Sequence, residues 1–137
     1  METLGLCRVT FEDNTDFKKI MDSIQQNGKL NKLTVQHFEF DEESYAKSLG
    51  KVLTNSRSVK EVDISNVEFT HPKSFYDVCS AFLNERCRLS TFKLRGITLT
   101  NLEAKIIQFI FMKNRSISTF DISHCKSNDS ENFEYFF

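Results

Sequence analysis

Charged side chains that recur about thirty residues apart are the groups in this chain best suited to recognition chemistry. Asp63, Lys93 and Asp121 are separated by intervals of 30 and 28 residues, and Arg95 follows Lys93 by two positions. Side chains of alternating sign at one position of a regular pattern favour lateral ion pairing or contact with a polar partner. Arg95 is the best contact candidate, because a guanidinium presents a flat fork of donors and is enriched at interfaces. For Asp63 and Asp121 the competing interpretation is surface pairing, which contributes only about 0–1 kcal/mol.

The remaining reactive side chains do not predict a catalytic or metal site. On a sheet with strands about 4.8 Å apart, His37 and His124 would lie three strands and roughly 14 Å from each other. The four cysteines form no C-x-x-C pair, and no G-x-x-x-x-G-K phosphate loop occurs. We therefore expect no catalytic residue, no cofactor and no metal, and a protein that is not an enzyme. Reduced thiols are typical of a cytosolic protein.

The charged residues belong to a longer pattern of apolar residues. Its clearest copy reads Leu89-x-x-Phe92-x-Leu94-x-x-Ile97-x-Leu99, and corresponding copies begin at residues 1, 30, 59 and 117. These starts divide the chain into five units, which we number one to five. A fixed period of this size predicts a stacked array of similar units, each packed on its neighbours.

Each unit predicts a short strand followed by a helix. In unit three, Val62 and Ile64 alternate with polar residues as in a half-buried strand. Ser74 is expected to cap the following helix, and Asn84 to end it in left-handed geometry. Successive strands separated by helices should be parallel and joined by right-handed crossovers. The apolar stripe expected along this helix is formed by Phe75, Val78, Cys79, Phe82 and Leu83.

The pattern resembles the leucine-rich repeat family, in its ribonuclease-inhibitor-like class with repeats of about 29 residues. The resemblance implies an α/β fold: a leucine-rich-repeat solenoid, or horseshoe arc, with parallel strands on the concave face and helices on the convex face. About five repeats would form a single domain over residues 1–137. One position of the repeat differs from the family, where it is usually Asn or Cys. Here only Cys125 fits, and the other four copies carry Val9, Phe38, Val67 and Ile97. In those four copies we expect hydrogen bonds from backbone or water to hold the bend instead.

The two ends of the predicted array lack polar covering units, which repeat proteins need for solubility. We therefore expect a fragment of a longer array, prone to self-associate through its uncapped ends; the alternative is a short protein whose ends are covered by a partner or by its own residues. Residues 128–131 fit either the start of a fifth helix or a loose tail. The aromatic residues that follow would then be exposed, and these are Phe133, Tyr135, Phe136 and Phe137.

The strand side chains between the core positions should face solvent on the concave wall. A non-catalytic protein–protein interaction module that binds its partner there is the function we expect. The family resemblance also allows a regulator of a small GTPase or of actin assembly, or the substrate-receptor portion of a ubiquitin ligase. The expected partner-binding residues are Gln36, His37, Asp63, Lys93, Arg95 and Asp121.

Bulk properties narrow the class of partner. The net charge is −1 and the pI is about 6.3, so no overall basic field attracts nucleic acid. No apolar run approaches the roughly 20 residues that span a membrane, and residues 1–25 show no secretory signal. We expect another protein as the partner, neither nucleic acid nor membrane, and a cytoplasmic location.

Overall fold

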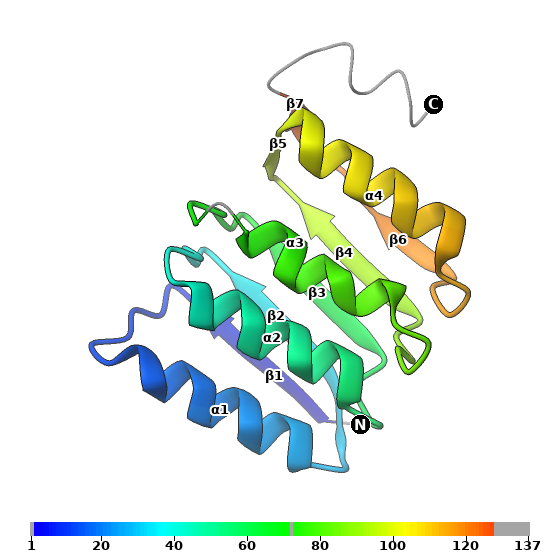
Figure 1. Ribbon diagram of the computed structural model, residues 1–137. Helices are drawn as coiled ribbons and strands as arrows, with labels where there is room; N and C mark the ends of the chain where they lie inside the picture. Colours follow the sequence, from blue (N-terminus) through cyan, green and yellow to red (C-terminus); the bar gives the residue numbers. More distant parts are fainter. Residues whose placement is uncertain (1, 72, 128–137) are drawn as a thin grey trace.

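A computed structural model describes residues 2–71 and 73–127 and shows a mixed α/β fold with one helical layer on one parallel sheet (Figure 1). The sheet has five strands in chain order: β1 (Glu2–Cys7), β2 (Leu30–Gln36), β3 (Glu61–Ser65), β4 (Thr91–Arg95) and β6 (Thr119–Asp121). The helices are α1 (Asn14–Gln26), α2 (Glu43–Asn55), α3 (Ser74–Cys79) and α4 (Asn101–Lys113), and the 3-10 helix η1 (Ser80–Leu83) follows α3. Two short strands, β5 (Thr98–Leu99) and β7 (Lys126–Ser127), pair beside the start of α4.

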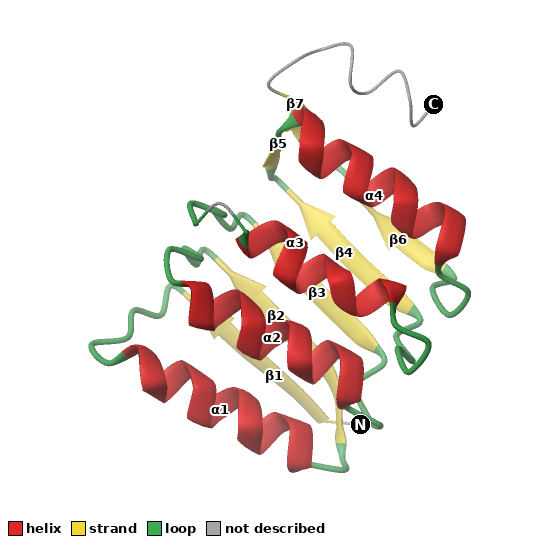
Figure 2. Cartoon of the chain, in the orientation of Figure 1, coloured by secondary structure: helices red, strands yellow, loops and turns green. Residues whose placement is uncertain are grey.

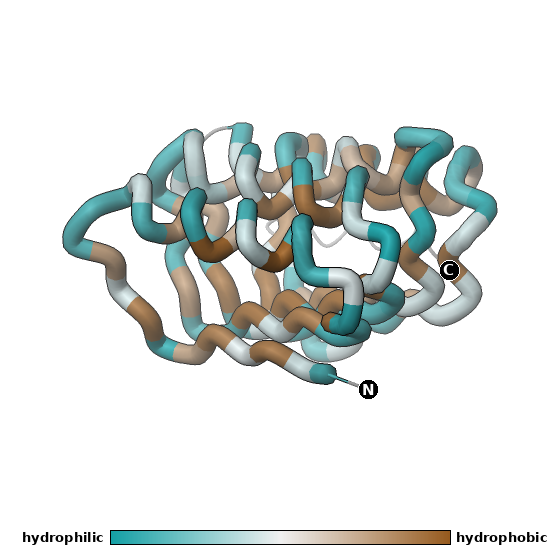
Figure 3. The backbone as a smooth tube through the Cα atoms, turned by 90° about the horizontal axis from the view of Figure 1, so that it is seen from below, coloured by the Kyte–Doolittle hydropathy of each residue, from teal (hydrophilic) through white to brown (hydrophobic). Residues whose placement is uncertain are grey.

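The strand register follows the apolar pattern of the sequence. Ile64 pairs with Val35 on one side and with Leu94 on the other, and all three are completely buried. The same positions therefore stack from unit to unit beneath the helices, as predicted. Figure 3 shows apolar stretches recurring in successive units, with polar residues at many of the turns. The expectation of parallel strands separated by helices is confirmed within the described residues.

The helices are amphipathic and cover only one face of the sheet (Figure 2). In α1, Phe17, Met21 and Ile24 are buried, while Asp13 caps the helix by accepting a hydrogen bond from the Thr15 amide. In α4, Thr100 and Glu103 form a reciprocal capping box. Both helices therefore begin at side chains that satisfy otherwise unpaired backbone amides.

Unit three departs from the expected helix. α3 has six residues and then changes to η1, whereas α1, α2 and α4 have 13 each. The prediction that Ser74 caps this helix is wrong: Ser74 lies inside α3 and donates its hydroxyl to the Phe40 carbonyl at 3.1 Å. The reason is burial, since a fully buried hydroxyl must find a partner and the neighbouring unit supplies it.

Asparagine acts at the helix ends, but in a different geometry from the predicted one. Asn84 has φ −87°, which is extended rather than left-handed. The side-chain oxygens of Asn27, Asn84 and Asn114 instead accept hydrogen bonds from amides two or three residues further on, at 2.6–3.0 Å. Ser56 takes the same place in unit two and accepts from the Val59 amide. These side chains close the turn that leads into the next strand.

Left-handed geometry occurs at the other end of the strands. In the five-stranded sheet, a residue one to three positions after each strand has a positive φ of 50–67°, and these residues are Arg8, His37, Asn66, Gly96 and His124. The amide of Asn66 donates to the Arg95 carbonyl at 2.8 Å, and the Gly96 amide donates to that of Ser123. Backbone hydrogen bonds thus hold this bend, as expected, and the Cys125 thiol adds one to the Leu94 carbonyl at 2.9 Å.

The two edges of the fold carry opposite charge. Because the strands are parallel, all helix-to-strand turns lie along one edge and all strand-to-helix turns along the other (Figure 1). We call the first the basic edge; its residues are Lys29, Arg57, Lys60, Arg86, Arg88, Lys113 and Arg115, with Glu85 among them. The opposite, acidic edge contains Glu12, Asp13, Glu39, Asp41, Glu42 and Glu68, with Arg8, Lys73 and Lys126 among them. Each sign suits the helix ends beside it, since acids favour helix N-termini and bases favour C-termini.

Candidate functional site

The face of the sheet without helices, here called the open face, collects the predicted site residues. Strand pairing places Asp63 beside Lys93 and Lys93 beside Asp121, and it places Gln36, Ser65 and Arg95 in a second row. Both rows agree with the positions predicted from the sequence. Alternation along the strands explains them, because Phe92 and Leu94 turn to the core while Lys93 and Arg95 turn away.

Asp63 is not a solvent-facing residue, and this part of the prediction is wrong. Only 4% of its surface is exposed. Arg95 Nη2 lies 2.8 Å from Asp63 Oδ2, and the Ser65 hydroxyl donates to Asp63 Oδ1. Arg95 Nε in turn donates to Ser65 Oγ at 3.3 Å. The long side chain of Arg95 and its neighbour Ser65 therefore remove the carboxylate from water.

This cluster holds Arg95 in a fixed orientation. The Asp63 carboxylate is buried and paired, so removal of Arg95 would leave a costly buried charge. Arg95 itself keeps 36% of its side chain exposed. Within the described part of the chain its hydrogen bonds use Nε and Nη2, and the Nη1 donors point to no protein acceptor. A guanidinium held in this way is prepared to contact a ligand with little further loss of entropy.

Lys93 does not join Asp63 and Asp121 in the predicted ladder of alternating charge. It pairs with Glu61 at 3.2 Å, and Lys32 reaches the same carboxylate oxygen at 3.4 Å. Lys93 therefore forms no ion pair with Asp63, its register partner on β3, because Arg95 already neutralises Asp63. Burial acts to raise the pKa of Glu61, but hydrogen bonds and charge from Lys93 and Lys32 outweigh it and hold the pKa below its usual value.

Asp121 is occupied by its own turn. Its carboxylate accepts a hydrogen bond from the Ser123 amide at 2.8 Å. This backbone bond is the main reason that the pKa of Asp121 is lowered, with smaller contributions from the charges of Arg95 and Lys93. Asp121 therefore stabilises the chain after β6 and adds negative charge at the border of the open face.

Gln36 and His37 lie at the end of β2. Gln36 is the last residue of the strand and is half-buried. His37 was expected on the strand wall, but it occupies the left-handed turn that follows, with φ 50°, and is exposed at the edge of the sheet. The backbone reverses its course there, so the alternation that places strand side chains no longer applies to His37.

Sequence reasoning placed Ser65 in the same row as Gln36 and Arg95, but it counted neither Ser65 nor Lys32 and Glu61 among the partner-binding residues. All three share the strand face of the predicted residues, and Glu61 precedes Asp63 by two positions. The period of two along a strand was the signal that would have found them. The result is a polar surface with Lys32, Lys93 and Arg95 surrounding two engaged carboxylates.

Among residues 2–71 and 73–127, no group of three or more His, Cys, Asp and Glu side chains is placed to hold a metal ion. Burial raises the pKa of the Cys79 and Cys125 thiols, so both are neutral and poorly nucleophilic.

No model of a known protein family matches the chain. Within the described residues, no helix has both the length and the apolar character that a membrane span requires.

Proposed function

We propose that the chain is a non-catalytic protein–protein interaction module of the leucine-rich-repeat type, which binds its partner on the open face of the sheet. This face would be the concave wall of a solenoid. Five parallel strands in chain order and units of 28–30 residues support this architecture. The free state of all four cysteines fits a reducing compartment such as the cytoplasm.

The observation that carries the proposal is the fixed position of Arg95 in the sheet. Asp63 and Ser65 hold its guanidinium from one side, while more than a third of the side chain remains exposed. Lys93 and Gln36 flank it with partly exposed polar groups. Prearranged arginines surrounded by polar side chains are frequent anchors of protein interfaces.

The test is a comparison of matched double variants in quantitative affinity capture with mass spectrometry. Gln36→Ala with Lys93→Ala removes partly exposed groups of the open face, while Lys18→Ala with Lys19→Ala removes exposed groups of α1. Each variant is first shown by circular dichroism to melt within a few degrees of the wild type. The proposal expects loss of partners only for the open-face variant.

The binding site on any recovered partner is then located by crosslinking from the open face. If the α1 variant loses the same partners while the open-face variant retains them, the open face is not the binding surface. If crosslinks from a recovered partner fall on the helices alone, the proposal fails as well.

A further inference from the structure

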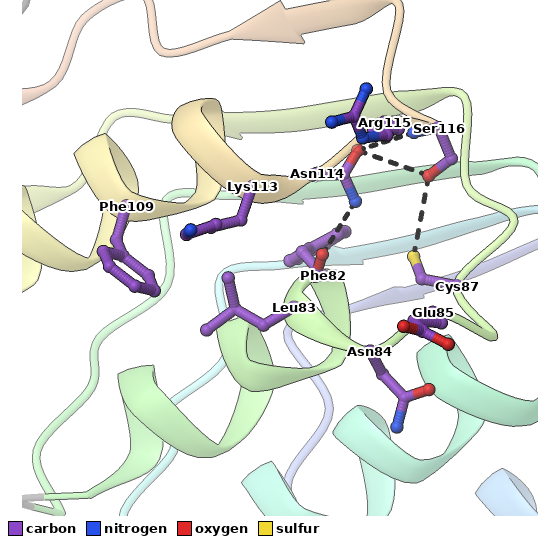
Figure 4. Close-up of a pocket in the computed structure, with 10 residues that line it drawn as sticks. All are labelled: Phe82, Leu83, Asn84, Glu85, Cys87, Phe109, Lys113, Asn114, Arg115 and Ser116. Atoms are coloured by element: carbon purple, nitrogen blue, oxygen red, sulfur yellow. Dashed lines mark hydrogen bonds between the residues drawn. The ribbon is translucent and has the colours of Figure 1, made fainter.

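A groove on the helical side lies between η1 and α4, where the helices approach the basic edge (Figure 4). Its volume is about 710 Å³. The groove exists because the helix of unit three is short. α3 ends at Cys79, and the tighter turn of η1 ends at Leu83, so no full helix stands beside the C-terminal half of α4.

The walls of the groove are apolar near α4. Phe82 is buried beneath it and Leu83 is half-buried, while Phe109 keeps 48% of its surface exposed. Figure 4 shows Leu83 and Phe109 on opposite sides of the same space. An exposed aromatic ring beside a second apolar side chain leaves apolar surface in water, and a ligand can bury that surface.

The surroundings of the groove are basic. Lys113 lies 5.8 Å from the centre of the Phe109 ring, and Arg115 follows it along the wall. A neighbouring hollow of about 680 Å³ on the same edge adds Arg57, Arg86 and Arg88. Glu85 is the acidic residue that lines both hollows. Among the described residues these five basic side chains form no ion pair.

We propose that this groove binds an acidic peptide segment that carries an aromatic side chain. The ring would pack between Leu83 and Phe109, and carboxylates of the peptide would pair with Lys113, Arg115 and the adjoining arginines. This surface is separate from the open face, which lies on the other side of the sheet, so the chain would hold two ligands at once.

Two features favour a peptide over a nucleic acid. The groove offers one exposed ring, whereas single-stranded nucleic acids bind on several successive stacking platforms. Glu85 lies within the basic stretch, and the C-terminal ends of η1 and α4 bring their carbonyl groups to the same edge. Both place negative charge where a continuous phosphate backbone would run.

A suitable test peptide has the sequence of residues 128–137, which combines three carboxylates with four aromatic rings. Fluorescence anisotropy of this labelled peptide would be measured with the full chain. Reversal of charge in Lys113→Glu with Arg115→Glu should weaken binding by at least about tenfold, since like charges then face each other. Phe109→Ser should weaken binding by about fivefold or more through loss of the apolar contact.

Control measurements decide between the possible occupants. Gln36→Ala with Lys93→Ala should leave the affinity unchanged, and peptides with Gln for Glu and Asn for Asp, or with Ser for Phe and Tyr, should each bind more weakly. No binding of the parent peptide overturns the proposal. Tighter binding of a ten-nucleotide single strand, insensitive to Phe109→Ser, overturns it in favour of a nucleic acid.

The remaining alternative occupant of the groove is the chain's own segment of residues 128–137. In the full chain, Asp129→Asn, Glu131→Gln and Glu134→Gln would together remove the negative charge of its side chains. If the added peptide binds only to this neutralised chain, the groove belongs to the chain's own segment, and the proposal of a separate peptide partner fails. Equal affinity of the two chains supports the proposal.

Discussion

The boundary between units two and three and the boundary between units three and four share one continuous sheet but differ in their helices. Val62 pairs with Leu33 across the first and with Phe92 across the second, and all three are buried. Above the first, α2 and α3 touch so closely that a Cβ on Gly50 would collide with the Asp77 carbonyl oxygen. Above the second, η1 and α4 leave the groove.

The open boundary has other connections. Arg95 and Asp63 join β4 to β3 on the open face, and the Asn114 side-chain Nδ2 donates to the Phe82 carbonyl at 2.8 Å. Phe82 also stacks on Phe92, with ring centroids 4.3 Å apart. The comparison teaches that the sheet sets the spacing of the units, while the helical layer can open locally without loss of strand register.

The largest expected effect lies in the core that both boundaries share. Ile64→Asp would place a charge at a position with no exposed surface and no partner, which costs several kcal/mol or more. We expect loss of cooperative melting followed by circular dichroism. Ile64→Val is the matched control and should cost only about 0.5–1.5 kcal/mol. An Ile64→Asp protein with the wild-type melting temperature would refute the common core.

The closed boundary should respond strongly to added volume. Gly50→Val must displace the backbone of Asp77, and overpacking of this kind costs about 1–3 kcal/mol or more in urea unfolding. At Gly28 an added Cβ meets no atom within 4 Å, so Gly28→Ala serves as the control. Equal stability of Gly50→Val and wild type would mean that α2 and α3 are not in backbone contact.

On the strand side of the open boundary, Arg95→Ala leaves Asp63 buried without its cation. We expect a loss of about 1–3 kcal/mol, the usual cost of an unsatisfied buried group. The double variant Arg95→Ala with Asp63→Ala should recover part of this loss, because no buried charge remains. If the double variant instead lost the sum of the stability losses of Arg95→Ala and Asp63→Ala measured singly, the two side chains would not be coupled.

Glu61 should give a smaller effect that depends on pH. Its pKa is lower in the folded state, so the ionised carboxylate stabilises the fold above the unfolded value of 4.5. This contribution is lost as the pH falls from 4.5 through the lower folded pKa. Because Glu61 and both lysines are partly exposed, we expect about 0–1 kcal/mol. Melting temperatures should fall less for Glu61→Gln than for wild type between pH 6 and pH 3, and an equal fall would contradict this role.

The smallest effect should come from Phe109 in the groove. Phe109 is exposed and Lys113 Nζ lies over its ring, so truncation to Ala should change stability by about 0.5 kcal/mol. Phe82→Ala beneath it is the contrast, with an expected loss of about 3–5 kcal/mol. If Phe109→Ala destabilised the chain as much as Phe82→Ala, the groove would be closed in solution.

Strand positions could be predicted from the sequence because apolar residues recur at the same positions in every unit, and in units two to four all of these residues but Phe69 are buried. The rows containing Asp63, Lys93 and Arg95 followed directly from that period. Which charges pair could not be predicted, because a long side chain such as Arg95 reaches residues of the neighbouring strand other than its register partner. Pairing depends on rotamers and on burial, which the period does not encode.

Helix lengths were also beyond the sequence pattern. The spacing of Phe75, Val78 and Phe82 suits one continuous α-helix, yet the chain tightens into η1 after Cys79. Similarly, Ser74 is a good capping residue by type, but its hydroxyl is claimed by Phe40 in the preceding unit. The predicted role of residues 128–131 and of Phe133, Tyr135, Phe136 and Phe137 concerns positions outside the described residues.

The opposite charges of the two edges have a consequence for the speed of association. The net charge is only −1, but among the described residues an excess of bases lies at one edge and an excess of acids at the other, which gives this part of the molecule an electric dipole. Each helix end contributes about half a unit of charge of opposing sign, which reduces this dipole without reversing it. At physiological salt the field extends about 8 Å from the surface. An approaching acidic protein is therefore turned toward the basic edge before contact, and encounters in that orientation are faster than random collisions.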